Sequence, residues 1–387
     1  MQVQAATKEF AMVAGEASGD LLASLLIDAL RTRRPDLRIT GIGGPHMRAR
    51  GFDAMWPSEK LAVRGYIEVL PHLRELLAIR RELGDRLLAR RPDVFIGIDA
   101  PDFNFGVEER LKVAGIPTIH FVSPSFWAWR AKKVEKLKRS ADHVLCIFPF
   151  EPELLAQHGV SASYVGHPLA SVIPMEPDKL GARRRLGLPE QGEIVAVLPG
   201  SRNSEIQQLA ARFFAAARLM LQKRPGLVFA VPAVPYLQEQ ITRIAQSAGL
   251  GDRVRIFKGE PHDVLAACDV ALVASGTATL ETALFKRPMV IAYHMNWISY
   301  WMMQGKQLQP WVGLPNILCR EFVVPELLQH KATPQALADG VLRWFDLRES
   351  APETIAALEQ RFTELHKTLQ RDTASLASDA IEKILAR

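Results

Sequence analysis

The sequence predicts an α/β protein made of two doubly wound domains that face each other across a cleft. Short apolar runs rich in β-branched residues alternate with longer amphipathic segments along nearly the whole chain, a pattern typical of βαβ units and parallel sheets. A second series of such units begins after Pro168, and the 387 residues suffice for two or three domains. Ligands of such folds bind at the carboxyl ends of the strands, so we expect the functional site there.

The first series contains five candidate strands, each followed by a loop and in places by a clear helical pattern, as at 21–32. These strands are expected at 10–14, 38–42, 94–99, 118–122 and 143–146. The second series predicts strands at 194–198, 228–232, 253–257, 270–274 and 289–293. Three prolines interrupt residues 166–179, which predicts a boundary between one domain at 1–168 and another at 169–352.

The tail predicts a helix over 353–387. Apolar residues recur there at steps of three and four, the spacing of one helical face; they are Ile355, Leu358, Phe362, Leu365 and Leu369. We expect this helix to pack back on the first domain or on a second subunit, which would make a homodimer.

Composition argues against several classes of protein. The net charge of +6 divides evenly between the two halves, whereas a nucleic-acid binder carries a basic domain or arm. The three cysteines are far apart and form no CxxC pair, which argues against disulfides and zinc and favours a reducing cytosol. The apolar N-terminal stretch is too short for a signal peptide or a membrane span. We therefore expect a water-soluble chain.

One segment of the second domain has the design of a phosphate site. In residues 196–206 a hydrophobic strand breaks at Pro199 and Gly200 and leads through Ser201 and Arg202 into a helical pattern. Small residues let backbone N–H groups approach an anion, the helix N-terminus adds a positive dipole, and the guanidinium offers two donors. The alternative is a capped helix start with a surface arginine; we favour the phosphate site.

A second segment, 270–284, repeats this design. A buried strand is followed by Ser275, Gly276 and Thr277, and Glu281 lies in the second turn of the next helix. The hydroxyls and N–H groups suit a diphosphate, and Glu281 suits the hydroxyls of a ribose; the alternative is an ordinary N-cap with a surface glutamate. Two such turns indicate a nucleotide diphosphate. The chain lacks the spacing of an ATP-binding P-loop and of a dinucleotide fingerprint, which argues against those cofactors.

The first domain supplies candidate carboxylates. The strand at 94–99 delivers Asp99 and Asp102 to its carboxyl end, where a carboxylate can act as a general base toward a hydroxyl. We favour Asp99, since Asp102 also fits a helix cap. Glu16, Ser18 and Asp20 open the first helix, and they suit either one wall of the cleft or, for the last two, a plain cap.

Two stretches predict contact with an anionic membrane. Residues 66–91 combine an apolar face with six arginines, and residues 125–139 place two tryptophans before six basic residues. Such surfaces suit the plane of a membrane, although each stretch alone also fits a core-facing helix with a solvated basic side. The apolar residues expected in the membrane patch are Val69, Leu70, Leu73, Leu76 and Leu77.

Eight motifs resemble the lipid-A-disaccharide synthase family. They occur in the family's order and spacing from about residue 10 to the end, as VAGEASGD, GIDAPDFN, VSPSFWAWR, FPFE, YVGHPL, LPGSRNSEI, ASGTATLE and LPNIL. The resemblance implies a glycosyltransferase of the GT-B fold, with two Rossmann-like domains. It implies that UDP-2,3-diacylglucosamine and 2,3-diacylglucosamine 1-phosphate are condensed to a β-1,6-linked disaccharide 1-phosphate and UDP, on the cytoplasmic face of the inner membrane of Gram-negative bacteria.

The resemblance also implies roles for individual residues. Asp99 matches the family's essential aspartate, and Glu16 lies in its first motif. Residues matching the UDP site are Ser201, Arg202, Ser275, Gly276, Thr277, Ala278, Glu281 and Asn316. Asp99 would take the proton of the acceptor's 6-hydroxyl while Arg202 stabilises the departing diphosphate, with inversion at the sugar and no metal or other cofactor. The alternatives are another GT-B enzyme, such as a UDP-N-acetylglucosamine epimerase or a soluble-acceptor transferase, and a non-catalytic lipid or nucleotide binder.

Overall fold

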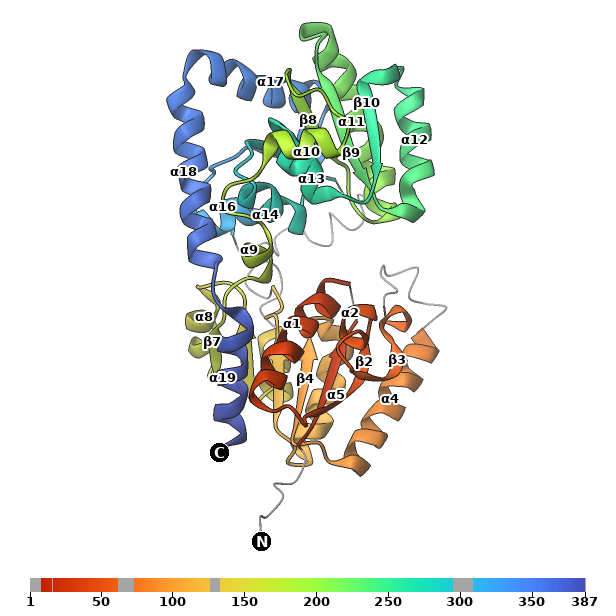
Figure 1. The fold of residues 1–387 in the computed structure, drawn as a ribbon, viewed down its shortest axis with the longest axis vertical. Coiled ribbons are helices and arrows are strands. Elements are labelled where there is room, and N and C mark those ends of the chain that lie inside the picture. The colour runs from red at the N-terminus through yellow and green to blue at the C-terminus, as the bar shows by residue number, and fades with distance from the viewer. Residues whose placement is uncertain (1–7, 16, 62–72, 126–132, 295–308, 387) are drawn as a thin grey trace. The chain divides into compact units, whose positions relative to one another are not determined.

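The chain divides into two compact units. The structure, a computed structural model, describes residues 8–15, 17–61, 73–125, 133–294 and 309–386. Unit 1 comprises Met1–Ser171 and Leu369–Arg387, and unit 2 comprises Val172–Thr368. The N-terminal unit is therefore completed by the end of the chain (Figure 1).

Unit 1 is built on a parallel seven-stranded sheet of order β3-β2-β1-β4-β5-β6-β7. Its strands are β1 (Glu9–Ala14), β2 (Arg38–Gly43), β3 (Asp53–Pro57), β4 (Val94–Ile98), β5 (Thr118–Phe121), β6 (His143–Cys146) and β7 (Ala162–Tyr164). The strand order reverses between β1 and β4, which is where doubly wound folds bind their ligands.

Helices cover this sheet on both faces. They are α1 (Ala17–Arg33), α2 (Pro45–Arg48), α4 (Leu73–Arg90), α5 (Pro101–Val113), α7 (Lys133–Ser140), α8 (Glu151–Gln157), α9 (Pro168–Val172) and α19 (Thr373–Leu385). The helix α4 packs beside α5, and α19 packs beside α1 (Figure 1). Ile79, Leu83 and Leu87 of α4 lie in a core cluster with Ala11 of β1 and Phe95 of β4. Apolar burial at these positions holds the helix to the sheet.

Unit 2 has a parallel six-stranded sheet of order β10-β9-β8-β11-β12-β13. Its strands are β8 (Ile194–Leu198), β9 (Val228–Ala233), β10 (Val254–Lys258), β11 (Val270–Ala274), β12 (Met289–Tyr293) and β13 (Glu326–Leu328). Its reversal falls between β8 and β11, the two strands that lead into the predicted phosphate turns. Both units thus share one topology around their switch points.

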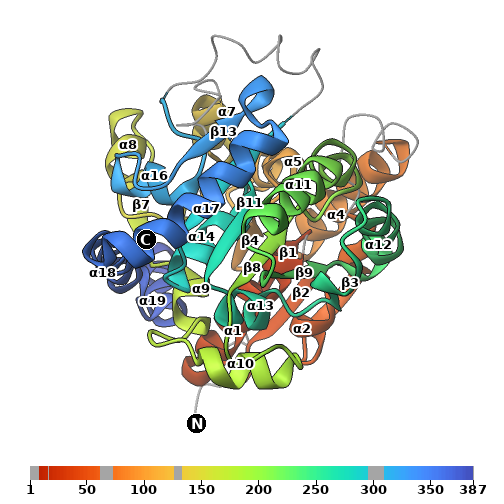
Figure 2. The same cartoon turned by 90° about the horizontal axis from the view of Figure 1, so that it is seen from above.

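The helices of unit 2 are α10 (Lys179–Arg185), α11 (Asn203–Lys223), α12 (Gln238–Ser247), α13 (Pro261–Ala267), α14 (Thr277–Leu284), α16 (Leu314–Cys319), α17 (Pro334–Ser350) and α18 (Pro352–Leu369). The helix α17 lies along α11, as Figure 2 shows from above, and α10 packs on α13. The buried side chains of α11 recur at helical spacing, so one face of this helix is anchored to the sheet.

The α/β prediction is confirmed. All ten predicted strands are present, with ends shifted by at most one residue, and β3, β7 and β13 are additional. The chain first passes from unit 1 to unit 2 between Ser171 and Val172, three residues beyond the predicted domain boundary at 168.

The prediction of one helix over 353–387 is wrong, because the tail forms two. The first, α18, lies in unit 2, and the second, α19, lies in unit 1. The break is local: Asp372 caps α19 by accepting a hydrogen bond from the N–H of Ser375 at 3.1 Å, the preferred use of aspartate at a helix start. The apolar stripe from Ile355 to Leu369 is buried within this single chain.

Candidate functional site

Three residues at the carboxyl edge of the unit 1 sheet have left-handed backbone although none is glycine. Asp99 and Ala100 follow β4 with φ of 50° and 43°, and Val122 follows β5 with φ of 75°. Left-handed backbone costs a residue with a side chain roughly 1–3 kcal/mol and persists mainly at functional sites. The two neighbouring strands β4 and β5 therefore end in strained turns, one of which bears the predicted base.

Asp99 is half-buried and well anchored. Its N–H donates to the carbonyl of Phe121 at 2.8 Å, and its own carbonyl accepts from Asn104 Nδ2 at 2.8 Å. Asp102 is exposed in the first turn of α5, where a carboxylate favours the helix dipole. The two aspartates thus occupy different settings: Asp99 sits on the strained turn at the sheet edge, and Asp102 on the surface of a helix.

The loop after β1 borders the same edge. A Cβ at Gly15 would lie 3.3 Å from Cβ of Ala100, so the ends of β1 and β4 pack closely at the switch point. Asp20 is 1% exposed and accepts hydrogen bonds from the N–H groups of Gly44, His46 and Met47. Asp20 is therefore a cap, but of α2 and not of its own helix. Glu16, also predicted here, lies outside the described residues.

The first predicted phosphate turn of unit 2 follows β8. Gly200 has φ of 126°, a conformation that favours glycine, and Ser201 and Arg202 are exposed. The carboxylate of Glu205 accepts from the N–H of Ser201 at 2.8 Å and from Arg202 Nη1 at 2.8 Å. An acidic side chain thus occupies the donors that an anion would use.

The second turn follows β11. Gly276, with φ of 152°, precedes α14, and Thr277 and Ala278 are its first two residues. Their N–H groups have no intrahelical acceptors because of their position in the first turn. Ser275 donates its N–H to the carbonyl of Ala292 at 2.9 Å. The strands β8 and β11 are adjacent, so the two turns emerge side by side from one edge of the sheet.

Glu281, predicted to contact a ribose, is held by a residue that sequence reasoning missed. His262 Nε2 lies 3.1 Å from Glu281 Oε1, and the His262 ring contacts Phe285 with centroids 5.5 Å apart. His262 belongs to α13 and Glu281 to α14, nineteen positions apart in the chain. The contact brings a third helix start, after β10, toward the candidate site.

Asn316 is fully buried and satisfied within the protein. Its amide donates to the carbonyl of Val324 at 2.9 Å and to Glu326 at 2.8 Å, and its oxygen accepts from the N–H of Val323 at 2.9 Å. The pKa of Glu326 lies above its ordinary value because the carboxyl is buried, and hydrogen bonds from Gly313 and Asn316 oppose this shift only in part. The same segment meets α14, because Leu314 N–H donates to Thr279 Oγ1 at 3.2 Å. Asn316 therefore organises the loop beside the second turn.

The predicted membrane patch is described only in part, since Val69 and Leu70 lie outside the described residues. Leu73 and Leu77 are 40% and 43% exposed at the start of α4, Leu76 is half-buried, and Ile79 points into the core. Several arginines of this helix are paired, as in Arg86 with Glu82 at 2.5 Å. None of the described helices is long and apolar enough to cross a membrane.

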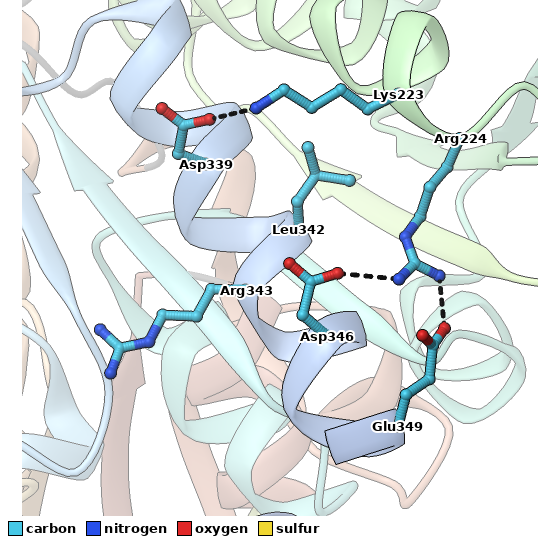
Figure 3. A pocket seen from close by; sticks show the side chains of 7 residues that line it. All are labelled: Lys223, Arg224, Asp339, Leu342, Arg343, Asp346 and Glu349. Atoms are coloured by element: carbon cyan, nitrogen blue, oxygen red, sulfur yellow. Dashed lines mark hydrogen bonds and ion pairs between the residues drawn. The ribbon is translucent and has the colours of Figure 1, made fainter. Parts of the chain in front are cut away.

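A polar surface pocket lies elsewhere in unit 2. It measures about 630 Å³ and is lined by residues of α17 together with Lys223 and Arg224 at the carboxyl end of α11. Figure 3 shows Lys223 paired with Asp339 and Arg224 paired with Asp346 and Glu349. Arg202 precedes the opposite end of α11, so this pocket is separate from the phosphate turns.

These features define a class of protein. The two units have the topology of Rossmann-like domains, and the pair is the GT-B fold, shared by glycosyltransferases and nucleotide-sugar epimerases. Solved structures with this fold include a putative UDP-N-acetylglucosamine 2-epimerase from Listeria monocytogenes (TM-score 0.65, 12% identity, 97% of this chain and 95% of that one). Another is MurG of Acinetobacter baumannii (TM-score 0.56, 12% identity, 97% and 99% covered).

The chain belongs to the lipid-A-disaccharide synthase family. The family model described as "Lipid-A-disaccharide synthetase" matches residues 10–381. The lipid-A-disaccharide synthase of Verminephrobacter eiseniae is 62% identical over 97% of both chains, and that of Albidiferax ferrireducens is 60% identical over 97% of both. The family predicted from the eight motifs is confirmed. The epimerases share the fold alone, so the family match separates this chain from them.

Proposed function

We propose that this protein joins two acylated glucosamines. It would transfer the sugar of UDP-2,3-diacylglucosamine to the 6-hydroxyl of 2,3-diacylglucosamine 1-phosphate, giving a β-1,6-linked tetraacyl disaccharide 1-phosphate and UDP. One structural observation carries the proposal beyond the family match. The switch-point edge of unit 1 presents a carboxylate at Asp99, and that of unit 2 presents two glycine turns that lead into helices, the design expected of a diphosphate site; these would be the two halves that such a transfer needs.

The donor site in this proposal is the edge formed by the two turns of unit 2. Arg202 and the N–H and hydroxyl groups of 275–278 bind the diphosphate, and Ser201 contributes from the neighbouring turn. Glu281 accepts from the ribose hydroxyls while His262 fixes its orientation. Asn316 acts indirectly, by holding the 312–326 segment against α14.

The chemical step assigns one task to each unit. The acceptor's 6-hydroxyl oxygen attacks C1 of the donor sugar from the face opposite UDP, and Asp99 takes the hydroxyl proton. The bond from C1 to the diphosphate oxygen breaks, and its electron pair leaves with UDP. Arg202 and the α14 N-terminus stabilise the negative charge that develops on the diphosphate. Attack from the opposite face inverts the anomeric centre.

An assay with the two lipid substrates tests this proposal. We expect UDP release together with a disaccharide product detected by mass spectrometry. Asp99→Asn should lower kcat on the order of 10²- to 10⁴-fold, the usual contribution of a general base, and should leave the affinity for UDP unchanged. Asp102→Asn is the matched comparison and should retain turnover. Full activity of Asp99→Asn would remove Asp99 from the mechanism.

We further propose that the start of α4 contacts the cytoplasmic face of the inner membrane, from which the enzyme would take its lipids. Leu73 and Leu77 are exposed apolar residues beside the exposed Arg74, an arrangement that suits an anionic interface. The double variant Leu73→Ser with Leu77→Ser should bind less to phosphatidylglycerol vesicles in a sedimentation assay while keeping its melting temperature. Val113→Ser, at an 84% exposed apolar position on α5, is the control and should bind normally. Equal binding of both variants would refute the patch.

A further inference from the structure

The turn that carries Asp99 needs support from its surroundings. Asp99 and Ala100 are consecutive left-handed residues, with φ of 50° and 43°, and neither is a glycine. Such conformations persist only where neighbouring groups over-determine them. One such neighbour is Asn104 on the next helix, whose side chain hydrogen-bonds to this turn.

Asn104 contacts both strained residues. Its Nδ2 donates to the carbonyl of Asp99 at 2.8 Å, and its backbone N–H donates to the carbonyl of Ala100 at 3.0 Å. The side chain is 0% exposed, so water does not compete for these bonds. Because the Asp99 carbonyl can only accept, the amide must present its NH₂ group to the turn. Asn104 thereby fixes the orientation of the peptide that follows Asp99.

A buried ionisable pair packs near Asn104, where Glu108 and Asn104 both lie against Gly97. Glu108, one helical turn further along α5, and His120 on β5 are both 0% exposed, and Glu108 Oε1 lies 2.7 Å from His120 Nδ1. Gly97 on β4 leaves the room for them: a Cβ there would lie 2.1 Å from Glu108 Oε1 and 3.0 Å from Asn104 Cβ. The Phe105 ring contacts His120 with centroids 4.9 Å apart. The buried region next to the Asp99 turn, formed by Gly97, Phe105, Glu108 and His120, is therefore tightly packed and partly polar.

We propose that Asn104 is a positioning residue for the transfer reaction. Its amide donates to the Asp99 carbonyl and so holds the left-handed turn that aims the Asp99 carboxylate, while Gly97 leaves room for the Asn104 side chain. Asn104 would touch no substrate and would act only through Asp99. The inference rests on the proposed role of Asp99 as the base.

Two variants test this inference. Asn104→Ala removes the donor, so kcat should fall on the order of tenfold to a hundredfold, the cost of a base that is misplaced by about 1 Å. KM for the acceptor should stay within about threefold, because no binding contact is lost. Asn104→Asp keeps the shape, and only its protonated carboxyl can donate to the Asp99 carbonyl. Relative to the wild type at the same pH, this variant should have nearly normal kcat at low pH and should lose kcat as the pH rises. The wild-type profile accounts for protonation of Asp99 itself, and the melting temperature is followed over the same range.

A matched control separates positioning from stability. Thr118 lies on β5 at the opposite end of the strand, is 0% exposed, and donates through Oγ1 to the carbonyl of Ser140 at 2.9 Å. Thr118→Val removes a buried hydrogen bond as Asn104→Ala does, and it should lower the melting temperature without changing kcat. If Thr118→Val lowers kcat as much as Asn104→Ala, the effect is one of stability and the inference fails.

The double variant Asn104→Ala with Asp99→Asn completes the test. If Asn104 acts through Asp99, the alanine should change kcat less than about twofold in the Asp99→Asn background, since coupled residues are not additive. Wild-type kcat in Asn104→Ala, with Asp99→Asn inactive, would overturn the positioning role alone. Wild-type kcat in Asp99→Asn would remove Asp99 as the base and this inference with it, while the proposed transfer activity would stand.

Discussion

Arg202, proposed to bind the diphosphate, is paired with an acidic neighbour in the structure. Its Nη1 lies 2.8 Å from Glu205 Oε1, and about half of its side chain is exposed, 51%. An exposed pair of this kind is worth at most about 1 kcal/mol, so a diphosphate can displace the carboxylate at little cost. The present pairing therefore agrees with the proposed role of Arg202.

Arg202→Ala should weaken UDP binding on the order of tenfold to a hundredfold, because a charged hydrogen bond to the diphosphate contributes about 1.5–3 kcal/mol. Isothermal titration with UDP measures the change. Arg218→Ala provides the comparison, since Arg218 is exposed on the same helix α11, and it should bind UDP as the wild type does. Unchanged affinity in Arg202→Ala would exclude the guanidinium from the donor site.

Two residues of the candidate site could not be predicted from the sequence. Asn104 acts on backbone carbonyls, and nothing in the motif GIDAPDFN distinguishes such an asparagine from a surface one. His262 meets Glu281 because α13, which connects β10 to β11 across the sheet, packs beside α14. By contrast, Asp99 directly follows the strongly apolar strand β4 and Arg202 lies four residues beyond β8, so their place at a sheet edge follows from the strand pattern.

At the scale of elements, α11 begins with a capping box whose acid lies inside the candidate anion site. Glu205 accepts from the N–H groups of Ser201 and Arg202 at 2.8 and 3.3 Å. This arrangement stabilises the helix start by satisfying its first donors. It also places a negative charge where the diphosphate is proposed to bind, so helix stability and ligand affinity oppose each other here.

Glu205→Gln should therefore have two effects of opposite sign. The free energy of unfolding should fall by up to about 1 kcal/mol because the cap weakens, whereas the dissociation constant for UDP should decrease severalfold. Urea denaturation and UDP titration measure the two quantities. Glu239→Gln, an exposed acidic residue in the first turn of α12, should reproduce only the loss of stability. Weaker UDP binding in Glu205→Gln would show that the carboxylate supports the ligand.

Element prediction succeeded where burial leaves a clear pattern. Strands such as β8 and β11 are fully buried and read as continuous apolar runs. The missed strands are three to five residues long and only partly buried, as in Ala162–Tyr164 and Glu326–Leu328, so their sequences resemble loops. The helix break at Asp372 could not be predicted, because the apolar residues before it recur at helical spacing up to Leu369 and only a single aspartate marks the start of the next helix.

At the scale of the whole molecule, the chain passes between the two units twice, and the two passages adjoin. His167 N–H donates to the carbonyl of Leu369 at 2.9 Å, and Ser171 Oγ donates to the carbonyl of Arg371 at 3.2 Å. Gly166, with φ of 90°, allows close contact, since a Cβ there would lie 2.5 Å from Cβ of Arg371. The segment around His167 thus ties together both connections.

Burial of His167 makes the free energy of unfolding depend on pH. Burial lowers the pKa of His167 from 6.5 to about 4. Between these two values the unfolded chain binds a proton at His167 that the folded chain excludes. The free energy of unfolding is therefore unaffected by this residue above pH 6.5 and falls as the pH drops toward 4. The loss should reach about 3 kcal/mol. His167→Asn should show a shallower decline in urea denaturation over this range, and the exposed His158 gives the control variant His158→Asn. Equal slopes for wild type and His167→Asn would contradict this account.

The closing of unit 1 by α19 has a consequence for how the protein is made. Arg33 and Arg34 on α1 pair with Asp379 and Glu382 on α19, and Ile381 is fully buried in unit 1. Domains generally fold in the order in which the ribosome releases them, but here the first unit lacks α19 until residues 373–385 have been synthesised, after all of unit 2. Unit 2 is contiguous and can finish first, so the half synthesised earliest is the half completed last.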